Sequence, residues 1–132
     1  MSQSIANYWL ESCVSTVSQK DLAAHMNLIS KNVSLQGITE IAEITYADWE
    51  NQCRHEFNND NIKQVSYDAI KMTSSTATHV LFKTMATVEA NDRTINVQGI
   101  EVLLETEADG ECRLIQERIL STDECRHDGL LN

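Results

Sequence analysis

The first third of the chain repeats its apolar side chains at helical spacing. Between residues 3 and 17 they recur every three to four positions and form one stripe, which is typical of an amphipathic helix. Residues 18–21 have the spacing of a capping box with Ser18 as the N-cap, and they predict a second, shorter helix to about residue 30.

A third helix is predicted after residues 45–48, which offer another cap. Trp49, Cys53 and Phe57 follow at intervals of four residues and give this helix one apolar face. The asparagine and aspartate residues at 58–61 should end it, because their side chains compete for backbone hydrogen bonds.

The rest of the chain favours strands. Residues 33–37 alternate and end in a glycine, whereas residues 38–44 are ambiguous between strand and loop. Valine, isoleucine, threonine and leucine are frequent in four later segments, at 62–72, 77–89, 93–106 and 111–120. Turns at Asn91-Asp92 and Asp109-Gly110 join these segments as an antiparallel meander. Helices followed by a meander predict the α+β class, with three N-terminal helices packed on one face of the sheet.

The phase of the apolar positions changes at Gly99. Ile95 and Val97 precede it, whereas after it the even-numbered positions are apolar. A β-bulge at Gln98-Gly99 would explain the change and bend the sheet sharply, although a strand buried on both faces would give the same pattern. We favour the bulge.

Length, composition and charge narrow the function classes. A chain of 132 residues with 42% apolar side chains has the size of one domain, and we expect it over residues 1–132 with a flexible tail at 122–132. The net charge of −10, with scattered lysines and arginines, disfavours binding to nucleic acid or to a membrane surface. The cysteines are far apart and no stretch approaches the ~20 apolar residues of a membrane span, so a cytoplasmic protein with reduced thiols is expected.

The tripeptide Cys-Arg-His occurs twice, at residues 53–55 and 125–127, and raises the question of a metal site. On a helix Cys53 and His55 project about 200° apart, so they cannot bind one ion together. A zinc site needs three or four converging ligands, and the second tripeptide has no evident partners. We therefore expect no metal and no cofactor.

The order and spacing of the predicted elements resemble the nuclear-transport-factor-2-like superfamily. The resemblance rests on Asp21-Leu22 at the start of the second helix, Leu28-Ile29 at its end and the strand Val33-Ser34-Leu35-Gln36-Gly37. The capped helix and the bent meander extend it over residues 4–121. It implies a cystatin-like cone, in which a strongly curved sheet and three helices enclose an open pocket. Members include ketosteroid isomerase, SnoaL-type polyketide cyclases, dehydratases and oligomerisation modules.

The resemblance does not extend to the catalytic set of ketosteroid isomerase. The position of its aspartate base falls at Gln36-Gly37, and the position of its oxyanion-binding phenol falls near Cys13, whose thiol is a poor substitute donor. Dehydratases of this fold pair a histidine with an aspartate, which leaves His25 and His79 as candidate catalytic bases.

The resemblance also implies which side chains line the pocket. In the last strand, Leu114, Gln116 and Arg118 would share the inner face. Glu101 of the preceding strand is expected opposite Gln116 or Arg118. Glu101 and Arg118 could anchor a carboxylate ligand or form an ordinary surface pair, and we favour the surface pair. The predicted pocket residues are Trp9, Cys13, Tyr46, Trp49, Cys53, Glu101, Gln116 and Arg118.

Several predicted strands carry apolar residues on both faces. Burial of the second face against another copy predicts a homodimer through the sheet. The first hypothesis for function is a protein that binds a small organic molecule in the cone pocket, with catalysis open and not favoured. The alternatives are a SnoaL- or dehydratase-type lyase or isomerase that uses His79 or His25, and a dimeric protein-interaction module.

Overall fold

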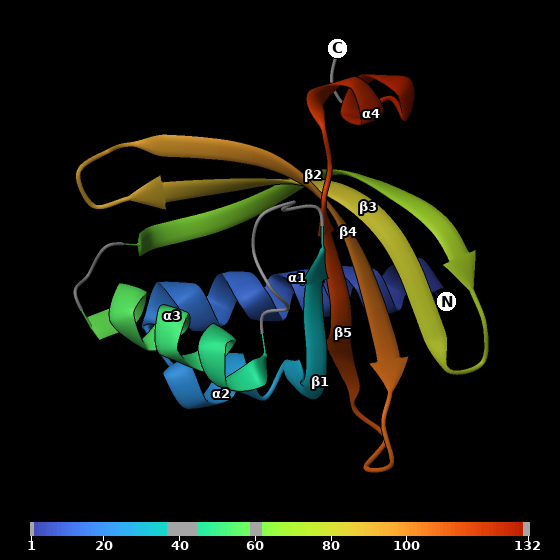
Figure 1. The fold of residues 1–132 in the computed structure, drawn as a ribbon, viewed down its shortest axis with the longest axis horizontal. Coiled ribbons are helices and arrows are strands. Elements are labelled where there is room, and N and C mark those ends of the chain that lie inside the picture. Colours follow the sequence, from blue (N-terminus) through green and yellow to red (C-terminus); the bar gives the residue numbers. More distant parts are fainter. Residues whose placement is uncertain (1, 37–44, 59–61, 131–132) are drawn as a thin grey trace.

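The computed structural model describes residues 2–36, 45–58 and 62–130, so the ambiguous segment at 38–44 lies outside the described residues. The described elements follow the predicted order of helices and then a meander (Figure 1). They are α1 (Ser2–Gln19), α2 (Leu22–Met26), β1 (Ile29–Gln36), α3 (Tyr46–Asn58), β2 (Ile62–Ser75), β3 (His79–Ala90), β4 (Ile95–Thr106), β5 (Cys112–Ile119) and α4 (Thr122–His127).

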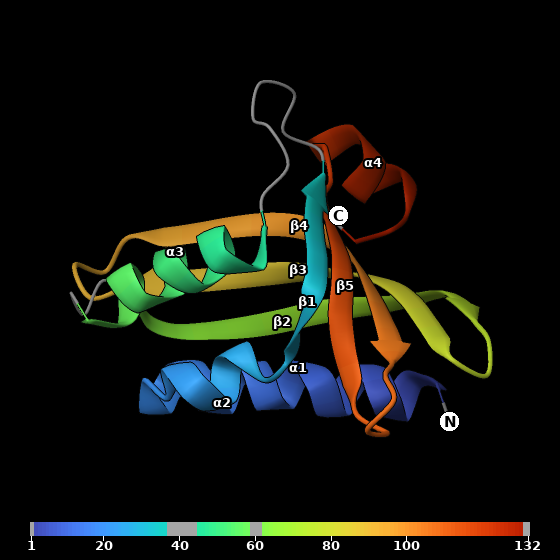
Figure 2. The ribbon, with the colours of Figure 1, turned by 60° about the horizontal axis from the view of Figure 1, so that its bottom comes forward.

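The described strands form one curled sheet in the order β1-β5-β4-β3-β2. Strands β2 to β5 form the predicted antiparallel meander, and the α+β fold class is confirmed. β1, however, pairs with the edge of β5 in parallel (Figure 2). The sheet is therefore mixed, whereas an antiparallel sheet is predicted. A parallel neighbour needs a long crossover between the two strands, and α3 together with the meander supplies it.

α1 buries most of the predicted apolar stripe, whose buried members are Ala6, Trp9, Leu10, Cys13 and Val17. The helix continues beyond the predicted N-cap Ser18 and ends where Lys20 adopts a left-handed φ of 56°. Asp21 caps α2 instead, because its Oδ1 accepts a hydrogen bond from the Ala24 backbone N–H at 3.1 Å. α2 also ends earlier than predicted, since β1 already begins at Ile29.

The predicted cap of α3 is confirmed. The Thr45 Oγ1 accepts a hydrogen bond from the Asp48 backbone N–H at 3.2 Å. In return the Asp48 Oδ2 accepts from the Thr45 backbone N–H at 3.2 Å, which completes a reciprocal capping box. The helix buries Cys53 and Phe57 and leaves Trp49 half-buried.

The middle of β4 is buried on both faces. β4 pairs with β3 from Ile95 to Glu105 without a register shift, so the predicted bulge at Gln98-Gly99 is wrong. Gly99 faces α4 across the sheet from the main core, whereas Ile100 belongs to that core. Ile95 and Val97 lie on the same face of the strand as Gly99 but are exposed, whereas Ile100 and Val102 are buried on the other face. The alternative explanation, a strand buried on both faces, therefore applies only from Gly99 onward.

A bulge that the sequence did not predict lies in β5. Leu114 pairs with Leu104, yet the next pair joins Gln116 to Leu103, so Ile115 is an extra residue. Side chains beyond the bulge therefore point to the opposite face from the one that strict alternation predicts.

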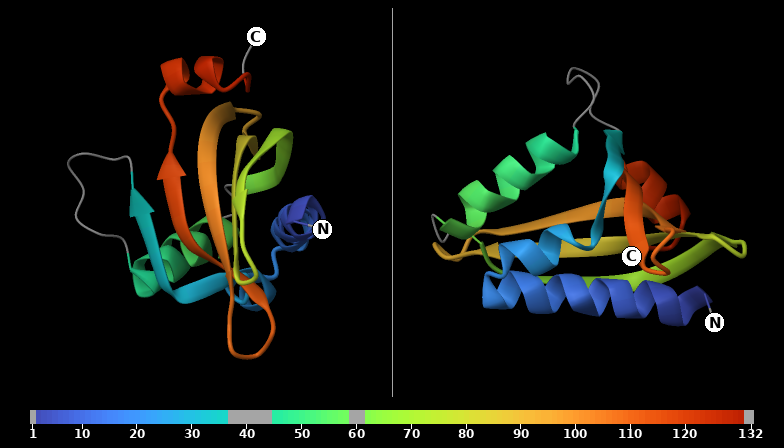
Figure 3. Two further views of the ribbon diagram at one scale, coloured as in Figure 1. Left: turned by 90° about the vertical axis from the view of Figure 1, so that its right-hand side faces the viewer. Right: turned by 90° about the horizontal axis from the view of Figure 1, so that it is seen from below.

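Besides a small cluster of Val17, Phe57 and Val65, which joins α1, α3 and β2, two clusters of buried side chains lie on the two faces of the sheet. The larger one fills the space between the concave face and the helices α1 to α3. The smaller one, formed by Met85, Leu120, Cys125 and Leu130, lies on the convex face under α4. A flexible tail is expected at 122–132, but residues 122–127 form α4. Cys125 of this helix and Leu130 after it pack on the sheet, away from α1 to α3 (Figure 3).

None of the described helices is both long enough and apolar enough to cross a membrane.

Candidate functional site

A pocket of about 660 Å³ opens between the helices and the concave face of the sheet. Residues of α1, α2 and α3 form one side of it, and residues of β2 to β5 form the other. The right-hand view of Figure 3 shows how α1 and α3 flank the long strands. The wall is mainly apolar and includes Val17, Trp49, Cys53, Val65, Ile100 and Ile119. A pocket of this size and composition is typical of small-molecule sites.

Glu117 places a carboxylate deep in this pocket. Because of the bulge at Ile115, Glu117 and Ile119 point toward the helices, and Glu117 lies opposite the fully buried Val102. Its side chain keeps some accessible surface because it faces the pocket, although the rest of its surroundings are protein. Among the residues that the structure describes, its carboxylate forms no hydrogen bond and no ion pair.

The environment of Glu117 shifts the pKa of its carboxyl group close to neutral pH. Burial raises the pKa of the Glu117 carboxyl to about 7, because the charged form loses water and gains no partner. At pH 7 the protonated and ionised forms are therefore both populated. A carboxyl group in this condition can donate or accept a proton.

Three side chains near Glu117, those of Cys13, Cys53 and Tyr67, are neutral at pH 7. Tyr67 and Cys13 lie close to one another, and burial raises the pKa of both groups well above their usual values. Burial also raises the pKa of the Cys53 thiol to about 12. These groups offer O–H and S–H dipoles to a ligand and no charge.

His25 lines the pocket from α2, as one of the two predicted candidate bases. Burial lowers the pKa of His25 to about 4, so the imidazole is neutral at pH 7. Its Nδ1 lies 2.9 Å from the Thr16 Oγ1, and its ring contacts Phe57 with 5.6 Å between ring centroids. These contacts hold the ring at the edge of the pocket.

The structure places the predicted pocket residues from α1 and α3 in different surroundings. Trp49 and Cys53 line the pocket, and Cys13 lies against Tyr67 and Glu117 beneath it. Trp9 is buried in the core, where its Nε1 donates to the Leu28 carbonyl oxygen at 3.0 Å. Tyr46 lines a separate depression beside Met26 and Arg113.

Glu101, Gln116 and Arg118 do not face the pocket, which corrects their predicted position. Glu101 pairs with Arg118 across β4 and β5, as predicted, but on the convex face. The bulge at Ile115 is the physical reason, because it reverses the orientation of Gln116 and Arg118.

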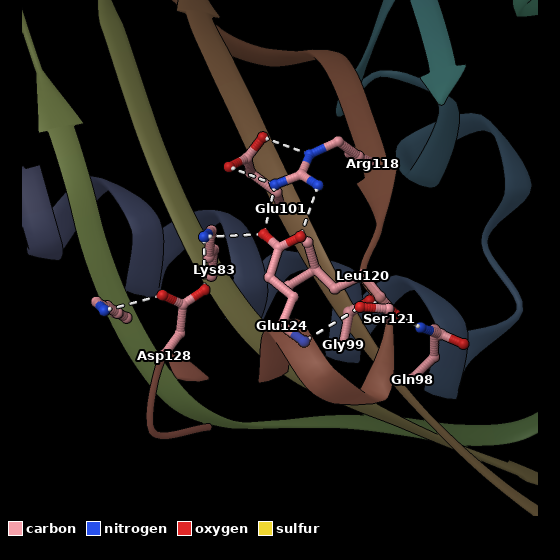
Figure 4. Close-up of polar contacts among 10 residues, drawn as sticks. Lys83, Gln98, Gly99, Glu101, Arg118, Leu120, Ser121, Glu124 and Asp128 are labelled. Atoms are coloured by element: carbon pink, nitrogen blue, oxygen red, sulfur yellow. Dashed lines mark hydrogen bonds and ion pairs between the residues drawn. The ribbon is translucent and has the colours of Figure 1, made fainter. Parts of the chain in front are cut away.

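Arg118 belongs to an ionic cluster that fastens α4 to the sheet (Figure 4). Its Nε donates to Glu101 at 3.1 Å, and its two terminal nitrogens donate to Glu124 at 3.0 and 2.7 Å. Lys83 contacts Glu124 at 3.0 Å and Asp128 at 2.6 Å. Arg118 and Lys83 together lower the pKa of the Glu124 carboxyl to about 2. The cations of this cluster are therefore paired with carboxylates of the protein itself.

His79, the second candidate base, lies outside the pocket at the start of β3. Its Nε2 is 3.1 Å from Glu105 and its Nδ1 is 2.8 Å from the Thr78 hydroxyl. Its side chain is 42% exposed. The structure thus gives His79 surface contacts and no access to the cone.

Sequence reasoning missed Glu117. The residue stands between Gln116 and Arg118, and strict alternation assigns it to the convex face. No glycine or proline marks the bulge at Ile115, so the sequence carries no local signal for the change of face. The pairing of a glutamate with the apolar Val102 becomes visible only when the register is known.

In the part of the chain that the structure describes, no group of three or more histidine, cysteine, aspartate or glutamate side chains is arranged to hold a metal ion.

No protein-family model matches the sequence. No curated protein matches it significantly. Solved structures, by contrast, show the same fold, at sequence identities too low to carry more than the fold.

Three of these structures are informative. An NTF-2-like protein of unknown function from Shewanella oneidensis has a TM-score of 0.75 at 9% identity, with 90% of this chain and 98% of that chain covered. ActVI-ORFA from Streptomyces coelicolor has a TM-score of 0.71 at 11% identity, with 92% of this chain and 97% of that chain covered. A candidate scytalone dehydratase from Novosphingobium aromaticivorans has a TM-score of 0.71 at 8% identity, with 91% of this chain and 83% of that chain covered. The chain has the nuclear-transport-factor-2-like fold, as the sequence predicts.

Proposed function

We propose that the protein binds a small, mainly apolar organic molecule in the cone pocket, with Glu117 as the principal polar contact. The observation that carries this proposal is a carboxylate without a partner among the described residues, at the bottom of a pocket of about 660 Å³. An apolar wall supplies burial energy, and a small number of polar groups fixes the orientation of a ligand. A protein-interaction module would have no need to keep this space inside the cone open.

Acid–base catalysis is a second candidate, because the pKa of Glu117 lies near 7 and the group faces open space. Solved structures with this fold include a candidate ketosteroid isomerase and a candidate scytalone dehydratase. A lyase or isomerase reaction would require both the pocket and Glu117, whereas binding alone would tolerate Glu117→Gln. Turnover that disappears in this variant while binding persists would therefore favour the enzyme.

The test of binding uses a variant that fills the pocket. Ala86 of β3 lines the pocket, and Ala86→Phe would place a ring in it. We expect this variant to lose binding of the neutral dye Nile red, measured by fluorescence titration, and to lose any small molecule that native mass spectrometry finds on the wild-type protein.

The matched control is Thr87→Phe, which adds the same ring one residue further along β3. Thr87 pairs with the exposed Val97, on the convex face. Dye binding should persist in this control at wild-type affinity. Equal dye binding by Ala86→Phe and wild-type protein would place the dye elsewhere and contradict the proposal.

A further inference from the structure

The charges around the pocket have one sign. Asp48, Glu56 and Glu117 line it, and the described lining includes no lysine and no arginine. His25 is neutral at pH 7 because burial lowers its pKa to about 4. The segments outside the described residues contain no lysine, arginine or histidine in the sequence, so they can add no basic side chain.

Two arginines that directly follow pocket residues in the sequence are engaged elsewhere. Arg118 follows Glu117 directly, but it lies on the convex face and holds Glu101 and Glu124. Arg54 of α3 pairs with Glu50 on an exposed side of the helix. No cation of the described protein therefore compensates the Glu117 carboxylate, and the ion that would stabilise it best must come from outside.

We infer that the ligand of the cone pocket is a small amine, with its ammonium group on the Glu117 carboxylate and its apolar body against the pocket wall. This inference rests on the proposed function and specifies its ligand class.

Several features of the site fit such a ligand. An ammonium group and a buried carboxylate form a charge-assisted hydrogen bond, one of the stronger polar contacts available to a protein. Trp49 lies in the same wall, and an indole ring attracts a cation. Asp48 and Glu56 line the same pocket, and the net charge of −10 attracts cations to the whole molecule. A ligand with a carboxylate would meet repulsion from the same groups.

Binding of an amine should release protons. Protonated Glu117 must ionise to pair with an ammonium group, and with its pKa at about 7 this release amounts to about half a proton at pH 7. Among the described residues, the other titratable groups that face the pocket or Glu117 are Cys13 of α1, His25 of α2, Asp48, Cys53 and Glu56 of α3, and Tyr67 of β2. Cys13, His25, Cys53 and Tyr67 are already neutral at pH 7, so Glu117 is the expected source of the proton.

The experiment compares three probes with one carbon skeleton, 4-phenylbutylamine, 4-phenylbutanol and 4-phenylbutyrate, by isothermal titration calorimetry. At pH 8 we expect the wild-type protein to bind the amine at least about tenfold more tightly than the alcohol, and the carboxylate most weakly. At pH 7, titrations in two buffers of different ionisation enthalpy should show release of about half a proton with the amine and none with the alcohol.

Two variants locate the interaction. In Glu117→Gln the amine and the alcohol should bind with similar affinity and without proton release. In Glu56→Gln, which removes another carboxylate of the lining, the preference for the amine should remain. Loss of the preference in Glu56→Gln alone would overturn the assignment to Glu117.

The outcomes also separate this inference from the proposed function. If wild-type protein binds the alcohol at least as tightly as the amine, the pocket is a binding site but the amine class is wrong. If the amine does not bind although Nile red does, the amine class is likewise wrong. If the wild-type protein binds neither these probes nor Nile red, the proposed function fails as well.

Discussion

At the scale of single residues, Glu117 is costly for folding. A carboxylate that leaves water without gaining a hydrogen bond or a counter-ion loses hydration that nothing in the described protein replaces. Its sequence neighbours Gln116 and Arg118 lie on the convex face instead. The Arg118 guanidinium there is paired with Glu101 and Glu124. A costly residue at the bottom of an open pocket is what a binding or catalytic site requires.

The pH dependence of stability should reveal this cost. The pKa of Glu117 rises from 4.5 to about 7 on folding, so between these values the unfolded chain ionises first and stability falls as pH rises. We expect the stability advantage of Glu117→Gln over wild type to grow between pH 4.5 and 7.5, by on the order of 3 kcal/mol at most.

Urea unfolding followed by circular dichroism at each pH measures this difference. The lowered pKa of His25 acts in the opposite direction, because protonation of the unfolded chain reduces stability as pH falls from 6.5 toward 4. Since His25 is present in both proteins, its contribution cancels in the comparison. Parallel stability curves for the two proteins would mean that Glu117 is solvated normally.

At the scale of elements, the contact between α4 and β4 depends on the missing side chain of Gly99. A Cβ built there would overlap the Cys125 sulfur and lie 3.3 Å from the Met85 sulfur. α4 can therefore approach the sheet only because this position carries no side chain.

A double-mutant cycle tests this contact. Gly99→Ala should destabilise the protein by about 1–3 kcal/mol, because the new methyl group pushes α4 away from the sheet. In a Cys125→Ala background the cost should be clearly smaller, since the overlapping sulfur is gone, and thermal unfolding measures both values. In an Arg126→Ala background, which alters an exposed residue of the same helix, the cost should stay the same. Additive effects of Gly99→Ala and Cys125→Ala would refute the contact.

The elements were largely predictable from the sequence, and the orientation of the site was not. Helical stripes and the cap at Thr45 are local features, and they predicted α1, α3 and the meander. The bulge at Ile115 and the packing of α4 on Gly99 arise from contacts between distant segments, which leave no mark in a short window of sequence. For that reason the sequence places Trp49 and Cys53 in the pocket, but it assigns Glu101 and Arg118 to the wrong face and gives no sign of Glu117.

At the scale of the whole molecule, the convex face of the sheet is only partly covered. α4 packs over Met85 and Gly99. Further along β4, Ile95 and Val97 are 60% and 56% exposed. Burial of these side chains against a second copy would remove apolar surface from water, so the homodimer through the sheet stays a prediction.

Sedimentation velocity can test the homodimer. A dimer would have twice the 14.9 kDa mass of one chain, and Val97→Lys should shift it to the monomer because a charge would enter the interface. Tyr8→Lys is the control, since Tyr8 is 71% exposed on α1. A wild-type monomer at all concentrations would contradict the prediction.

The two tryptophans occupy the two environments that matter most. The indole of Trp9 is fixed in the core by the Leu28 carbonyl oxygen, whereas the indole of Trp49 forms part of the pocket wall. Fluorescence emission from Trp9 should therefore follow the integrity of the fold, and emission from Trp49 should follow the contents of the cone. The molecule thus carries two intrinsic optical reporters, one for folding and one for occupancy, without an added label.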